Sequence, residues 1–144
     1  MKRHEVQFIQ LSDGWNAEPN APDETVSVDG DAVVLDFAVN AFLYPEFVEG
    51  SRAQLRFQSC LRFRLGSTND EGWYRGQCRF SSLAPKWGEF YLVSGEEALL
   101  SAPTDWVSLT SQISSPRNHY LFYLRDSTFE CEAEAFSLEL PERM

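Results

Sequence analysis

The sequence has few of the residues that build metal centres and none of the common catalytic motifs. Its 144 residues include three cysteines without a C-x-x-C pair, and only two histidines, His4 and His119, which are far apart. These residues do not have the ligand spacing of a zinc site. Nucleotide-binding loops, nucleophile elbows and metalloprotease motifs are absent as well. The sequence therefore predicts no metal site and no cofactor, and it does not favour the common classes of enzyme.

Long hydrophobic runs are also missing. The first residues, MKRHEVQFIQL, contain basic side chains but no apolar run after them, so the segment does not resemble a signal peptide. No window approaches the 18 apolar residues of a membrane-spanning helix. A small, odd number of cysteines is typical of reduced thiols. These features predict a cytoplasmic protein that does not bind membranes.

Positive charge is scarce. The chain has 12 Lys and Arg residues against 22 Asp and Glu residues, a formal net charge of -10. Repulsion from phosphate groups disfavours nucleic acid and anionic membranes as partners of such a chain. The same charge suits a basic protein partner.

Short alternating segments dominate what is present. Asp29-Gly30 lies between two alternating runs and predicts a hairpin, after which Val33, Leu35 and Phe37 share one apolar face. Seven to nine such strands, with frequent turns and at most one or two short helices, predict a mainly β fold. We expect a single domain over 1–144, built as an antiparallel β-sandwich or a partly closed β-barrel.

The segment 52–65, RAQLRFQSCLRFRL, concentrates arginine in an acidic chain. Residues 52–82 contain six arginines against two carboxylates, a formal charge of +4, which leaves -14 for the rest. Period-two alternation over 52–65 predicts one strand with two unlike faces. The predicted apolar face consists of Leu55, Phe57, Leu61, Phe63 and Leu65. The predicted polar face consists of Gln54, Arg56, Gln58, Cys60, Arg62 and Arg64.

The segment 73–83, WYRGQCRFSSL, alternates in the same way. If it pairs with 52–65 as a hairpin, both apolar rows must point to one core, which brings the polar side chains together. We call this set the arginine face: Arg56, Arg62, Arg64, Trp73, Arg75 and Arg79. Cys60 lies among these arginines and is expected to be a passive, partly exposed thiol.

Two interpretations of the arginine face remain open from the sequence. In the first, the arginines form a charge ladder with Glu130, Glu132 and Glu134, in which each directly opposed pair contributes about 0.2–1 kcal/mol. In the second, the face binds an acidic peptide, protein or ligand, because arginine and tryptophan are enriched where interfaces gain most of their energy.

The last strands and one tryptophan complete the predicted core. Phe129, Cys131 and Ala133 alternate with the glutamates, and the apolar phase then shifts to even-numbered residues, which indicates a β-bulge near Ala135. Trp15 lies in a loop rich in Asp, Asn and Pro, and we expect it to cover one end of the core.

These features together predict a non-catalytic binding or interaction protein that uses the arginine face. Its size, charge and predicted compartment are similar to those of small acidic immunity-type or regulatory proteins, which is an analogy of composition only. One alternative is a β-barrel that holds a small apolar or anionic ligand. Another is an enzyme of unrecognised type.

Overall fold

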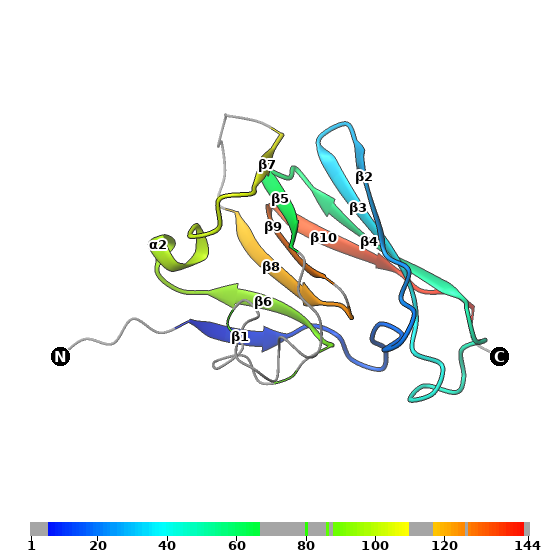
Figure 1. Ribbon diagram of the computed structural model, residues 1–144. Helices are drawn as coiled ribbons and strands as arrows, with labels where there is room; N and C mark the ends of the chain where they lie inside the picture. The colour runs from blue at the N-terminus through cyan, green and yellow to red at the C-terminus, as the bar shows by residue number, and fades with distance from the viewer. Residues whose placement is uncertain are drawn as a thin grey trace.

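The computed structural model describes residues 6–66, 80, 86, 88–109, 117–125 and 127–142, and it shows a two-layer β-sandwich (Figure 1). All strand pairs are antiparallel. The six-stranded sheet has the order β1 (Gln7–Gln10), β6 (Phe90–Ser94), β8 (Asn118–Tyr123), β9 (Thr128–Ala133), β5 (Arg62–Gly66) and β7 (Val107–Ser108). The four-stranded sheet has the order β10 (Ala135–Glu139), β4 (Arg52–Gln58), β3 (Ala32–Ala38) and β2 (Thr25–Asp29).

The predicted mainly β fold is therefore confirmed, and the sandwich is the form it takes. The predicted barrel does not form among the described residues, because each sheet ends at two separate edge strands instead of joining the other all round. The hairpin at Asp29-Gly30 is present as the turn between β2 and β3, where Asp29 pairs with Ala32. Gly30 has a φ of +63°, in the left-handed region that glycine adopts without a steric penalty.

The prediction of one continuous strand over 52–65 is wrong. The chain leaves the four-stranded sheet after Gln58, and Ser59 takes a positive φ of +50°. It then enters the six-stranded sheet at Arg62. Two residues depart from the expected faces: Cys60, assigned to the polar face, is fully buried, and Leu65, assigned to the apolar face, is 41% exposed. Phe63 still packs against the core, as predicted. Apolar alternation continues on both sides of the bend, so the sequence pattern does not reveal it.

A second strand crosses between the sheets beside the first. β9 pairs with β5 in one sheet, and its continuation β10 pairs with β4 in the other. Gln58 faces Ala135 and Arg62 faces Glu132, so the three residues 59–61 lie opposite only two. The irregular pairing therefore lies beside Ala135, as predicted, but its extra residue is on the facing segment 59–61. The shift in apolar phase that suggested a bulge marks the place where the strand passes from one sheet to the other. Strands that change sheets in this way are known to form the corners of sandwiches.

The main core fills the space between the two sheets. Among its fully buried side chains are Phe37, Phe57, Phe90, Phe122 and Phe129. Trp15 is only 3% exposed and stacks on Phe37 with ring centroids 5.8 Å apart, which confirms its predicted position over the core. Cys131 is also fully buried there, as expected.

The outer face of the six-stranded sheet has an apolar half and a charged half. A second apolar cluster lies over β1, β6 and β8 and is covered by the short helix α2 (Glu97–Leu100), which Figure 1 shows outside this sheet. Its buried members are Val6, Tyr91, Val93, Leu100, Leu121 and Tyr123. The charged half lies over β9, β5 and β7. In the described part of the chain, no helix has the length and apolar character needed to cross a membrane.

Candidate functional site

Two arginines of the predicted arginine face have carboxylate partners on the neighbouring strand. Arg62 lies directly opposite Glu132, and Arg64 lies opposite Glu130, in the register of β5 and β9. Arg62 Nη2 donates to Glu132 Oε1 at 2.6 Å, and Arg64 Nη1 donates to Glu130 Oε1 at 2.9 Å. These are two rungs of the charge ladder that the alternation predicts. Glu134 lies beyond the last β5–β9 pair, at the bend, and is not a rung.

The ladder is largely shielded from solvent. Glu130 is fully buried, and the Arg64 side chain is 13% exposed. Burial opposes the charge of Arg64, but its hydrogen bond to Asp105 and the charge of Glu130 outweigh burial and raise the pKa of Arg64. The hydrogen bond from Arg64 lowers the pKa of Asp105. His119 Nε2 lies 2.6 Å from Glu130 Oε2, so this carboxylate has partners on both sides.

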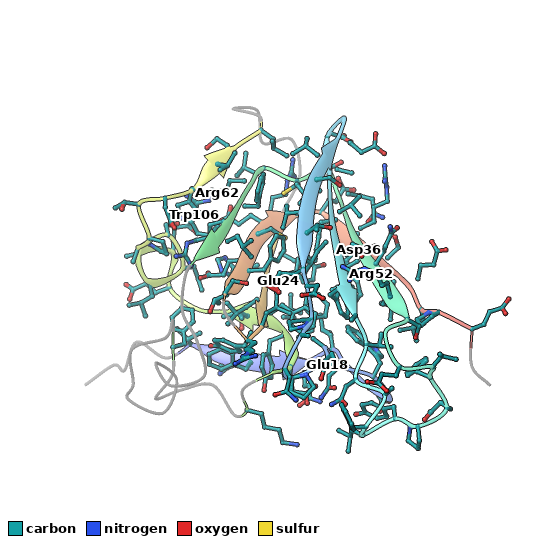
Figure 2. All side chains as sticks on the ribbon, turned by 45° about the vertical axis from the view of Figure 1, so that its right-hand side comes forward. Glu18, Glu24, Asp36, Arg52, Arg62 and Trp106 are labelled. Carbon is teal, nitrogen blue, oxygen red and sulfur yellow. The ribbon has the colours of Figure 1, made fainter. Side chains whose placement is uncertain are left out.

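Arg62 also packs against an aromatic ring that the sequence analysis did not connect with it. Its guanidinium carbon lies 4.3 Å from the centre of the Trp106 ring (Figure 2). Trp106 also meets the ring of His119 edge-on. Such a cation–π contact adds to the ion pair in a partly desolvated position. The ladder, Trp106 and His119 form one packed network, which explains these arginines as part of the structure.

Arg56 does not belong to the same surface. It lies on β4 in the four-stranded sheet, where its Nη2 donates to Asp29 Oδ2 at 2.8 Å. The prediction that Arg56 shares a face with Arg62 and Arg64 is wrong, because the bend at 59–61 places them in different sheets. Trp73, Arg75 and Arg79 lie outside the described residues, so their binding role stays a prediction.

Cys60 is not the partly exposed thiol that the sequence suggests. It lies in the core with Cys131, and both side chains are fully buried. A hydrogen bond between the two thiols lowers the pKa of Cys60, although burial opposes that shift, and burial raises the pKa of Cys131. Within the described ranges, no group of three or more His, Cys, Asp or Glu side chains is placed to hold a metal ion.

A different surface stands out at the loop that joins β3 to β4. Its residues Phe42, Leu43 and Val48 are 70%, 59% and 51% exposed. Three exposed apolar side chains on one short loop are more informative than single ones scattered over a surface. We call these three residues the apolar loop tip. In Figure 1 the loop is the cyan segment that extends at the lower right. This surface was not expected from the sequence, although the apolar run AFLY at 41–44, just before Pro45, was a signal.

The apolar loop tip is held in a defined shape. Asn40 Oδ1 accepts hydrogen bonds from the backbone N–H groups of Phe42 and Leu43, each at 3.1 Å. Phe47 is 2% exposed and anchors the far side of the loop in the core. Ser51 then closes the loop by donating its backbone N–H to the Val48 carbonyl at 3.0 Å. The exposed side chains therefore sit on an ordered scaffold.

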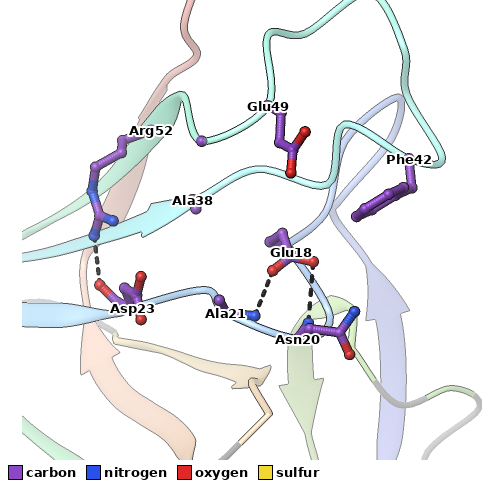
Figure 3. Close-up of a pocket in the computed structure, with 9 residues that line it drawn as sticks. Glu18, Asn20, Ala21, Asp23, Ala38, Phe42, Glu49 and Arg52 are labelled. Carbon is purple, nitrogen blue, oxygen red and sulfur yellow. Dashed lines mark hydrogen bonds between the residues drawn. The ribbon is translucent and has the colours of Figure 1, made fainter.

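A pocket of about 400 Å³ lies beside this loop (Figure 3). It is lined by Glu18, Asn20, Ala21, Asp23, Ala38, Phe42, Glu49, Gly50 and Arg52. Glu18 accepts hydrogen bonds from the backbone N–H groups of Asn20 and Ala21, which fixes one wall. Arg52 pairs with Asp36 and donates to the Asp23 carbonyl at 2.6 Å, which fixes another. Three carboxylates and one guanidinium give the lining a formal charge of -2.

No family model, no curated protein and no solved structure matches the chain.

Proposed function

We propose that this protein is a non-catalytic interaction domain that binds a partner protein through the apolar loop tip of Phe42, Leu43 and Val48. The observation that carries the proposal is the exposure of these three large side chains on one ordered loop. Exposed apolar side chains that gather on one surface often mark interaction sites. Functional residues of β-sandwiches are frequently carried by such loops on a rigid scaffold.

The order of the loop favours binding. A loop that is already fixed by Asn40 and Phe47 loses little conformational freedom when a partner docks, so more of the contact energy remains as affinity. The charge of the chain, -10, and the acidic pocket beside the loop favour a basic partner segment.

This proposal moves the binding surface away from the arginine face. Arg62 and Arg64 each have a carboxylate partner, so their charges are already balanced within the protein. A ligand site inside the sandwich has no support among the described residues, because aromatic rings pack across the space between the sheets. The free, buried thiols of Cys60 and Cys131 support the further proposal that the protein acts in the cytoplasm.

The test compares the wild-type protein with a Leu43→Ser/Val48→Ser variant. Both substitutions are at exposed positions, so the free energy of unfolding should change by no more than about 0.5 kcal/mol. Val107→Ser is the matched control, because Val107 is 48% exposed but lies on β7 of the other sheet. Partners are captured from lysate, purified, and titrated against all three proteins by isothermal calorimetry.

We expect at least one purified partner to lose about tenfold or more in affinity for the double variant and to keep its affinity for Val107→Ser. Equal affinity of every purified partner for all three proteins would contradict the proposal. So would the absence of any partner that binds the purified wild-type protein.

A further inference from the structure

The pocket beside the apolar loop tip brings together one aromatic ring and several carboxylates. Figure 3 shows the side chains of Phe42 and Glu49, from the loop after β3, and Glu18, from the loop before β2, around one space. Ala38 and Ala21 contribute small apolar surface, and Gly50 contributes no side chain. The lining thus combines apolar surface with carboxylates.

Two of the pocket carboxylates are available to a ligand. Neither Asp23 nor Glu49 makes a side-chain hydrogen bond or ion pair with any described residue, and both residues are exposed. The Glu18 carboxylate is already engaged by two backbone N–H groups. The positive charge of Arg52 is balanced by Asp36, which lies outside the pocket. The unbalanced charge in the pocket is therefore negative, which selects against an anion.

The chemistry that fits this lining is a cation on an apolar stem. The face of an aromatic ring attracts a guanidinium or ammonium group, and carboxylates accept its hydrogen bonds. Arginine and lysine side chains also bury their methylene stems along apolar surface while the charged end stays near polar groups. A volume of about 400 Å³ lies within the range of ligand sites and is large enough to hold one such side chain.

We propose that this pocket binds one arginine or lysine side chain of the partner segment, with the cation between the Phe42 ring and the Glu49 carboxylate. The inference rests on the proposed function in one respect, that the side chain is presented by a bound protein. The pocket itself can be tested without that partner.

The probes are the N-acetyl amides of arginine and lysine, and N-acetyl-citrulline amide is the neutral control of nearly the same shape as arginine. Each is titrated into the ¹⁵N-labelled protein and followed by amide chemical shifts at constant ionic strength. We expect saturable shifts at Ala21, Ala38 and Gly50 with the cationic probes, and binding about fivefold or more weaker with citrulline. Equal binding of citrulline, or shifts confined to other parts of the chain, would overturn the proposal.

Variants separate the pocket from general electrostatics. Glu49→Gln should weaken binding of the arginine probe about two- to fivefold, and Phe42→Leu should weaken it by a similar factor. Glu139→Gln is the charge-matched control, because Glu139 is an exposed residue of β10 that does not line the pocket. A loss of affinity in Glu139→Gln as large as that in Glu49→Gln would also overturn the proposal, since net charge alone would then explain the binding.

Leu43→Ser/Val48→Ser distinguishes this inference from the proposed function. Neither residue lines the pocket, so this variant should bind the arginine probe like the wild-type protein even if it loses its protein partner. Partner binding that is insensitive to this double variant, together with normal probe binding, would reject the loop tip but not the pocket. If instead the double variant loses its partner and the wild-type protein does not bind the arginine probe, the pocket is rejected but not the loop tip.

Discussion

Arg64 Nη1 donates a hydrogen bond to Glu130 Oε1 at 2.9 Å, and the two residues face each other in the register of β5 and β9. Glu130 is fully buried and also lies 2.6 Å from His119 Nε2. A buried carboxylate that loses its cation keeps its desolvation cost without compensation. We therefore expect the loss of this pair to cost more stability than the loss of an exposed ion pair.

Removal of the Arg64 charge should destabilise the protein strongly. We expect Arg64→Gln to lower the free energy of unfolding by about 3–5 kcal/mol, because it leaves the Glu130 charge buried with less compensation. Urea unfolding followed by tryptophan fluorescence measures the change. Arg56→Gln is the control: its ion pair with Asp29 is exposed, with side chains 43% and 68% accessible, and should cost no more than about 1 kcal/mol. Equal losses in the two variants would show that burial does not set the energy of these pairs.

Asp105 should contribute to the loss of stability in acid. Its pKa in the folded protein lies below the ordinary value, owing to the hydrogen bond from Arg64. Its contribution is therefore complete above the ordinary pKa of an aspartate, near 4, and is lost as pH falls through the lower, folded value. Because Asp105 is 54% exposed, Asp105→Asn should cost less than about 1 kcal/mol at pH 7. The difference in the free energy of unfolding between variant and wild type should shrink as pH falls from about 5 through the folded pKa, and a constant difference in urea unfolding would contradict this.

Tyr91 should act at the opposite end of the pH scale. Burial in the second apolar cluster raises the pKa of Tyr91 to about 12, and its hydroxyl donates to the Lys86 carbonyl at 3.0 Å. The folded state keeps this proton when the unfolded state has lost it, so stability falls as pH rises from about 10 to about 12. In Tyr91→Phe the fall over this range should be smaller, although the variant loses about 1 kcal/mol at pH 9 with the hydrogen bond. Urea unfolding of both proteins at pH 9 and pH 11.5 measures the fall in the free energy of unfolding. An equal fall in Tyr91→Phe and the wild-type protein would exclude Tyr91 as its source.

The thiols of Cys60 and Cys131 should be protected by the fold. Both are fully buried, so alkylation requires the core to open. We expect each to react with iodoacetamide at neutral pH at least about 100-fold more slowly in the native protein than in urea. Peptide mapping by mass spectrometry reports the two sites separately. Rapid labelling of Cys60 in the native protein would mean that the reagent can reach this thiol, whose pKa is lowered. Cys60 would then become a candidate reactive group.

The sequence was most informative where local chemistry decides the structure. Asp29-Gly30 predicted its hairpin, because a tight turn needs a residue that tolerates a positive φ. The alternation of arginines in one segment and glutamates in another predicted the two rungs of the ladder, because opposite charges on facing strands attract.

The sequence was least informative where the result depends on distant parts of the chain. The bend at 59–61 leaves the alternation of apolar residues almost intact, so Arg56 and Arg62 read as neighbours on one face although they lie in different sheets. Trp106 and His119 reach Arg62 only through tertiary packing. The pocket arises from two loops that are separated in the sequence, and no local pattern places Glu18 opposite Glu49.

The two neighbouring bends, at which 52–66 and 128–139 pass from one sheet to the other, affect how the protein unfolds. The segments 52–66 and 128–139 each contribute a strand to both sheets and remain hydrogen-bonded to each other on both sides of the corner. A sandwich whose layers are joined only by loops can in principle lose one layer first. Here the same two segments belong to both layers, so a rupture of either sheet removes pairing partners from the other. We therefore expect the described sandwich to unfold as one cooperative unit.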